Sequence, residues 1–220
     1  MSDPEHSILV WDAPTRLFHW LVVVLVAAAY VTLELNWMRW HAWAGDGVLA
    51  LVLFRLLWGF FGSETARFAS FLTAPATALR HLAHLLRREP DRQAGHNPAG
   101  GWMVLVLLAL LLGETLSGLF VANDVADEGP LTEMTPAPLA NAITALHWIF
   151  WDALVAAVTL HLLAILVYEV AKRHNLVLAM ITGRKILPAS VPLPRIASAA
   201  RGIFLLACSG LAAAALATYL

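Results

Sequence analysis

Five stretches of the chain are long and apolar enough to cross a lipid bilayer, and this limits the folds open to it. They cover residues 17–36, 41–62, 101–122, 143–168 and 201–219. A transmembrane helix needs roughly 20 consecutive, mostly apolar residues. Charged residues make up 13% of the 220 residues, whereas about 25% is usual in soluble domains. We therefore expect an all-α integral membrane protein, not a soluble, disordered or nucleic-acid-binding chain.

Lysine and arginine are distributed unevenly over the connections between these stretches. Cytoplasmic connections of membrane proteins are enriched in both residues. If the N-terminus is cytoplasmic, 12 of the 14 basic residues lie on the cytoplasmic side: Arg16, Arg67, Arg80, Arg87, Arg88, Arg92, Lys172, Arg173, Arg184, Lys185, Arg195 and Arg201. We therefore predict a cytoplasmic N-terminus. Segment 76–88 of the second connection has leucines at helical spacing with arginines beside them, which predicts a helix lying on the membrane surface.

Four histidines lie within or at the ends of the apolar stretches, where ionisable residues are rare and usually functional. His147 and His161 are 14 residues apart, which is about 21 Å along a helix and returns to nearly the same face. The second and fourth stretches run in the same direction, so His41 shares the outer level of His147. The first stretch begins at the inner side, so His19 shares the inner level of His161.

Each pair of histidines has the chemistry to hold a planar cofactor from both sides. Imidazole is a common ligand of haem iron, and two imidazoles leave no open coordination position, which favours electron transfer over oxygen chemistry. A single buried histidine is more often structural, but two depth-matched pairs have no structural explanation. A dinuclear metal site would need histidines and carboxylates at one level. We predict two haems with these four histidines as axial iron ligands.

Two arginines accompany the inner pair. Arg55 follows His41 by 14 residues on the same stretch and so reaches the inner level. A buried arginine is costly there, and a haem propionate would neutralise it; the alternative is a bond to a helix-end carbonyl. Arg16, one turn before His19, is either a second propionate partner or an anchor at the inner surface.

Several short motifs resemble the bacterial cytochrome b561 family, which includes the b-type cytochrome subunits of nickel–iron hydrogenases. They are WDAPTRLFHW at 11–20, His41 with Gly45, FRLLWGFFGS at 54–63, GHNPAGG at 95–101 and NLVLAMITGRK at 175–185. The resemblance covers residues 8–186 and implies a four-helix bundle with two haem b groups, His19 and His161 binding the inner and His41 and His147 the outer one. It leaves 187–220 as a linker and a fifth transmembrane helix.

Such proteins pass electrons between the membrane quinone pool and a partner, which for this chain could be a hydrogenase, another dehydrogenase or a periplasmic c-type cytochrome. The resemblance thus implies that the protein is an electron-transfer component of the bacterial cytoplasmic (inner) membrane rather than an independent enzyme. A stand-alone superoxide:quinone oxidoreductase of the same family is one alternative, although the acidic outer loop would repel that anion. A transporter or metal permease, which would be colourless, and a structural membrane anchor are the others. The loop acids, which could instead steer a basic partner, are Asp124, Asp127, Glu128 and Glu133.

Overall fold

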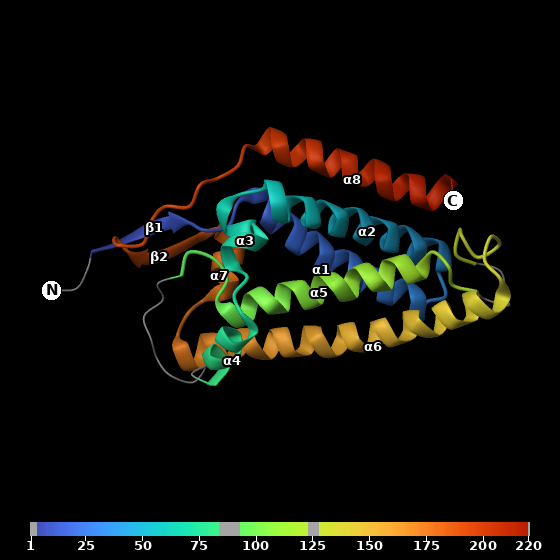
Figure 1. Cartoon of the computed structure of the whole chain (residues 1–220), viewed down its shortest axis with the longest axis horizontal. Helices are drawn as coiled ribbons and strands as arrows, with labels where there is room; N and C mark the ends of the chain where they lie inside the picture. Colours follow the sequence, from blue (N-terminus) through green and yellow to red (C-terminus); the bar gives the residue numbers. More distant parts are fainter. Residues whose placement is uncertain (1–3, 84–92, 123–127, 220) are drawn as a thin grey trace. The chain divides into compact units, whose positions relative to one another are not determined.

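The computed structural model describes residues 4–83, 93–122 and 128–219, and it is mostly helical. Within these residues five helices are long and apolar enough to cross a membrane. They are α1 (Ala13–Glu34), α2 (Met38–Phe61), α5 (Pro98–Gly118), α6 (Ala137–Val167) and α8 (Ala199–Tyr219) (Figure 1). Each overlaps one predicted stretch, so the predicted all-α membrane fold is confirmed and the protein is a multi-pass membrane protein.

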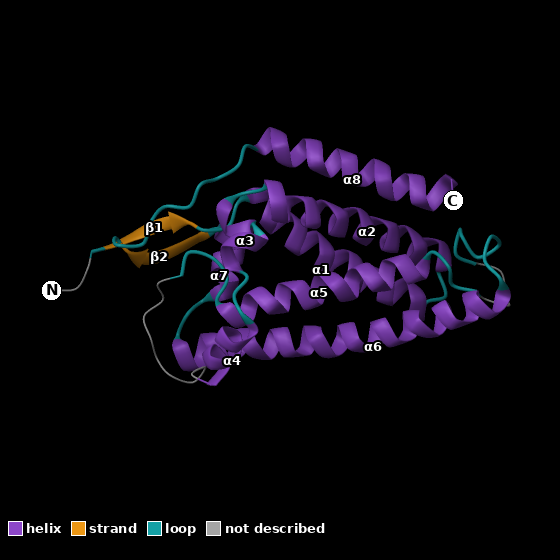
Figure 2. Cartoon of the chain, in the orientation of Figure 1, coloured by secondary structure: helices purple, strands orange, loops and turns teal. Residues whose placement is uncertain are grey.

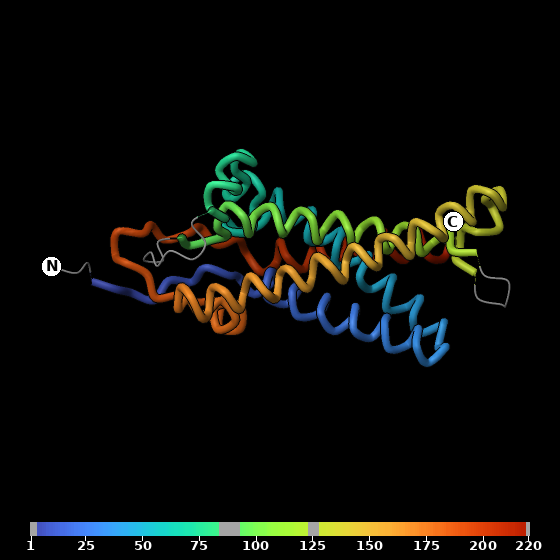
Figure 3. The backbone as a smooth tube through the Cα atoms, turned by 90° about the horizontal axis from the view of Figure 1, so that it is seen from below, coloured from blue at the N-terminus to red at the C-terminus, as the bar shows by residue number. Residues whose placement is uncertain are grey.

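The long helices end where the backbone leaves the helical region. Asn36, with φ 56°, follows the last turn of α1 and begins the short connection to α2. At its far end α6 continues into a π-helical turn, η2 (Tyr168–Lys172), and Arg173 with φ 59° stops it. Figure 3 follows α6 without a break into this turn. Both residues use the left-handed conformation that ends a helix and reverses the chain.

The chain divides into two compact units. We call the first the strand unit; it comprises Met1–Leu17, Leu57–Val106 and Ala157–Gly202. We call the second the cavity unit; it comprises Phe18–Leu56, Leu107–Ala156 and Ile203–Leu220. By sequence, 12 of the 14 lysines and arginines fall in the strand unit. The unit boundaries therefore separate the basic connections from the acidic ones.

The strand unit contains a small sheet that the sequence did not predict. Strand β1 (Glu5–Leu9) pairs antiparallel with β2 (Arg184–Pro188), and these strands are the two arrows in Figure 2. Ile8, Val10 and Leu187 are at most 1% exposed and form the centre of an apolar cluster beneath them. The sheet thus ties the residues just before α1 to the residues after α7 (Leu176–Thr182).

Short helices fill the rest of the strand unit: the 3₁₀ turn η1 (Glu64–Ala66), α3 (Phe68–Phe71) and α4 (Pro75–Ala83). Helix α4 covers the first part of the predicted surface helix 76–88, and residues 84–88 lie outside the described residues. Leu79 and Leu82 of α4 are 68% and 49% exposed. Exposed leucines beside Arg80 are what an amphipathic helix on a membrane surface requires.

Small residues let the helices approach one another in the cavity unit. A Cβ atom on Gly113 of α5 would lie 2.8 Å from the ring of Phe150 in α6. A Cβ on Gly47 of α2 would lie 2.9 Å from Leu25 in α1. Close approach through glycine is typical of packed membrane helices. These contacts bring α5 close to α6 and α2 close to α1.

Candidate cofactor site

A cavity of about 750 Å³ lies in the cavity unit, within the usual size range of ligand sites. Residues of α1, α2, α5 and α6 line it, among them His41 and His147. Its walls are largely apolar and aromatic: Tyr30 and Trp151 stack there with ring centres 5.5 Å apart. The structure therefore brings the predicted outer pair of histidines to one cavity.

The imidazole of His41 is held by the backbone of the neighbouring helix. Its Nδ1 lies 2.8 Å from the carbonyl oxygen of Ala29. A carbonyl oxygen only accepts hydrogen bonds, so Nδ1 carries the hydrogen and donates it. The lone pair of the neutral ring is then on Nε2, the nitrogen that a metal would bind. Metal-ligating histidines are commonly oriented by such a bond to a carbonyl.

His147 is held in the same way by the last turn of α5. Its Nδ1 lies 3.0 Å from the carbonyl oxygen of Glu114 and 3.1 Å from the hydroxyl of Ser117. Its Nε2 lies 3.4 Å from Oε1 of the Glu114 carboxyl group. Both outer histidines therefore direct Nδ1 to a carbonyl oxygen. For Nε2 of His147 to bind a metal, the Glu114 carboxyl group beside it would have to turn away.

Two glycines leave room beside these rings. Gly45 lies one helical turn after His41 and lines the cavity, and a Cβ atom added to it would meet nothing within 4 Å. A Cβ on Gly118 would lie 3.3 Å from Cε1 of His147, which is tighter than ordinary van der Waals contact. A flat, apolar group between two imidazoles fits this donor set and this space.

Most of the ionisable side chains that line the cavity, apart from the histidines, are acidic. Its lining includes the acidic residues Asp46, Glu114 and Glu128. Among the described residues, Arg39 is the one lysine or arginine that lines it. Oε2 of Glu114 is buried and has no hydrogen-bond partner in the described part of the chain. The guanidinium of Arg39 lies 4.5 Å from the centre of the Trp43 ring, a cation–π distance. Of the predicted loop acids, Asp124 and Asp127 lie outside the described residues.

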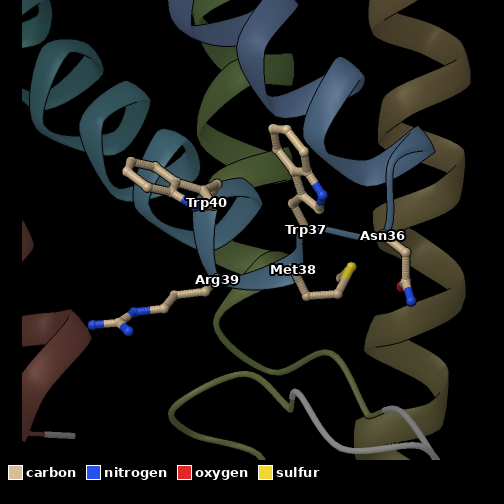
Figure 4. A pocket seen from close by; sticks show the side chains of 5 residues that line it. All are labelled: Asn36, Trp37, Met38, Arg39 and Trp40. Atoms are coloured by element: carbon tan, nitrogen blue, oxygen red, sulfur yellow. The ribbon is translucent and has the colours of Figure 1, made fainter.

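A second, shallower hollow of about 350 Å³ lies at the α1–α2 connection. Figure 4 shows Arg39 extending to one side of this hollow and Asn36 to the other. Trp37 and Trp40, which also line it, are 56% and 57% exposed. Exposed tryptophans at a helix end are typical of the membrane–water interface.

The predicted inner pair is divided between the two units. His19 of α1 belongs to the cavity unit and lies edge-on to Trp20, with ring centres 4.9 Å apart. His161 of α6 belongs to the strand unit and is partly buried. Their pairing remains a prediction from the sequence.

The two predicted arginine partners differ in their surroundings. Arg55 is 2% exposed in the cavity unit, as expected for a residue that faces the interior. Nη1 of Arg16 donates to the carbonyl oxygen of Ile181 at 2.6 Å, a contact suited to an anchor. Nε of Arg16 is buried without a hydrogen-bond partner among the described residues, so part of the guanidinium is left for another acceptor.

A polar cluster in the strand unit was not predicted from the sequence. The hydroxyl of Tyr168 lies 2.6 Å from Nε2 of His81 and accepts a hydrogen bond from Asn97 at 2.7 Å. It brings together α4, the start of α5 and the π-helical turn. No group of three or more His, Cys, Asp or Glu side chains suited to a metal ion occurs in the described ranges. The described residues therefore offer no site for the dinuclear metal centre considered as an alternative.

Comparisons with known proteins agree with the motifs. The sequence model of the prokaryotic cytochrome b561 family matches residues 10–183. The chain is 24% identical to a protein of Bradyrhizobium diazoefficiens named a probable Ni/Fe-hydrogenase B-type cytochrome subunit, over 81% of this chain and 86% of that one. It is 21% identical to a Rhodobacter capsulatus protein of the same name, over 81% of each. No solved structure matches significantly.

Proposed function

The chain belongs to the prokaryotic cytochrome b561 family, and from this premise we propose that it carries two haem b groups and conducts electrons between quinone and a redox partner protein. Family membership and the five long apolar helices make it a membrane b-type cytochrome of electron transfer. The number of haems, their ligands and the partners are the proposal.

The observation that carries the proposal is the arrangement of His41 and His147. Both line one apolar cavity, and the Nδ1 atom of each lies within 3.0 Å of a backbone carbonyl oxygen. In each ring the nitrogen that could bind a metal is then Nε2, and in His147 it faces the Glu114 carboxyl group. We assign the haem of this cavity to these two histidines. We assign the second haem to His19 and His161, with Arg55 and Arg16 as partners of its propionates.

Haem iron supplies a reversible one-electron couple when it is bound. The chain's own residues supply orientation and shelter. The carbonyl oxygens of Ala29 and Glu114 hold the two imidazole rings, and the stacked rings of Tyr30 and Trp151 form an apolar part of the cavity wall. Two histidine ligands per iron leave no position for a substrate, so the site would transfer electrons without binding oxygen.

Charge supports a direction for the chain in the membrane. The strand unit holds 12 of the 14 basic residues, so we place it on the cytoplasmic side of a bacterial inner membrane, with the N-terminus inside. Acidic residues outnumber arginine in the lining of the outer cavity, and the exposed carboxylate of Glu128 among them disfavours superoxide as a substrate. The names of the two relatives favour a hydrogenase-type partner.

The test is haem loss in purified full-length variants. We expect His41→Ala and His147→Ala each to lose the same haem, identified by its band in the redox difference spectrum. We expect His19→Ala and His161→Ala to lose the other. His174→Ala, which changes a histidine after the π-helical turn, is the matched control and should retain both.

Two results would contradict the assignment. One is full haem content in both His41→Ala and His147→Ala. The other is a grouping in which His41→Ala and His161→Ala lose the same haem. A colourless wild-type protein, expressed with adequate haem supply, would favour the transporter alternative.

A further inference from the structure

The last turn of α5 forms a cradle for one imidazole ring. Within it, Ser117 is 6% exposed, and its hydroxyl donates to the carbonyl oxygen of Glu114 at 3.0 Å. The same hydroxyl oxygen lies 3.1 Å from Nδ1 of His147, and that carbonyl oxygen lies 3.0 Å from Nδ1. The hydrogen on Nδ1 is therefore shared between two acceptors. Gly118 completes the cradle, because a Cβ there would lie 3.3 Å from the ring.

This arrangement exceeds what packing alone needs. A buried serine in a helix commonly bonds only to the carbonyl one turn earlier. Ser209 of α8 does so: it is 2% exposed, and its hydroxyl donates to Leu205 at 2.9 Å. Ser117 differs because its oxygen also faces the imidazole of His147 across the helix interface.

We propose that Ser117 is a positioning residue that lowers the reduction potential of the haem held by His147. The inference rests on the proposed function, since it takes His147 as an axial ligand. An acceptor on Nδ1–H makes the imidazole a stronger electron donor through Nε2. A stronger donor stabilises the ferric state relative to the ferrous state. Removing the Ser117 hydroxyl should therefore raise the potential of this haem and leave the other unchanged.

The size of the effect follows from one of two shared hydrogen bonds. A single neutral hydrogen bond usually changes an equilibrium by about threefold to fivefold. The potential shifts only by the difference in this bond's strength between the ferric and ferrous states, so for a one-electron couple at 59 mV per tenfold the rise should be at most about 30 to 40 mV. The carbonyl of Glu114 remains in place, so the ring should stay bound and oriented.

The experiment compares Ser117→Thr with Ser117→Val in the full-length, haem-loaded protein. The two side chains have nearly the same volume, but only threonine keeps the hydroxyl, so packing changes are shared and the hydroxyl is isolated. Haem content comes from the pyridine haemochrome, and the two midpoint potentials come from a spectroscopic redox titration. Ser209→Ala is the matched control and should leave both potentials at their wild-type values.

We expect Ser117→Val to raise one potential and Ser117→Thr to keep it near wild type. If Ser117→Val loses one haem while Ser117→Thr retains both, the hydroxyl holds the ligand in place instead of tuning its potential, and the inference is overturned. Equal potentials in the two variants, or equal haem loss, would overturn it. Failure of the proposed function is separate: the wild-type protein would then be colourless, or His147→Ala would keep the full haem content.

Discussion

Asp12 joins the start of α1 to α2 within the strand unit, and removing its carboxyl group gives the sharpest stability prediction. Its Oδ1 accepts the backbone N–H of Thr15 at 2.8 Å, which caps the helix that carries His19 two turns later. Its Oδ2 accepts the indole N–H of Trp58 at 3.1 Å. Asp12 is 3% exposed, so water cannot replace either bond.

The two bonds set the expected cost of Asp12→Ala. Loss of an N-cap costs about 1 kcal/mol, and removal of one partner of a buried hydrogen bond costs about 1–3 kcal/mol. Together they should lower the free energy of unfolding by about 2–4 kcal/mol. Asp12→Ser keeps a capping oxygen but is too short to reach Trp58, so it should lose about 1–3 kcal/mol.

The assay is reversible denaturation of the purified protein, followed by tryptophan fluorescence. Glu5→Ala, an exposed acidic residue of β1, is the control and should change stability by less than about 0.5 kcal/mol. A double-mutant cycle with Trp58→Phe should give a coupling free energy between positions 12 and 58. A cycle without coupling, or Asp12→Ser as costly as Asp12→Ala, would refute the reasoning.

Three further predictions follow from the same structure. Gly45→Leu should fill the cavity, and the protein should then lose one haem, measured by pyridine haemochrome. Gly210→Leu is the control and should keep both haems, because an added Cβ there also meets nothing within 4 Å but Gly210 does not line the cavity. Gly183→Ala should lower thermal stability, because φ is +81° and the Cβ would lie 2.6 Å from the carbonyl oxygen of Trp11; an unchanged melting temperature would contradict this. Replacing Glu128 and Glu133 by glutamine should slow reduction by a basic soluble cytochrome at low salt but not at high salt, where charge is screened; equal rates at low salt would remove this role.

Hydropathy was sufficient to predict the membrane helices but not where they begin. Helix α6 starts at Ala137 rather than at residue 143, because Pro138 in its first turn needs no hydrogen-bond acceptor there. Helix α1 starts at Ala13, since the Asp12 cap extends it through polar residues that a hydropathy pattern does not include. Helix ends thus depend on single capping residues and turns, which a hydropathy average over many residues does not detect.

The sheet and the histidine supports were beyond sequence reasoning for a different reason. Glu5 pairs with Pro188, and the sequence of a five-residue strand does not indicate a partner so distant in the chain. The spacing of histidines predicted that His41 and His147 would share a level, and both line one cavity. The carbonyl oxygens of Ala29 and Glu114 that hold them are backbone atoms, which residue identity does not reveal.

The ratio of haem b to polypeptide in the purified full-length protein tests the central claim most directly. Pyridine haemochrome absorbance, divided by protein concentration from amino-acid analysis, gives this ratio without assumptions about partners. The account predicts two haems b per chain, reducible by dithionite and with no ligand exchange on addition of carbon monoxide. A ratio of one or zero under full haem supply, or rapid carbon monoxide binding, would contradict it.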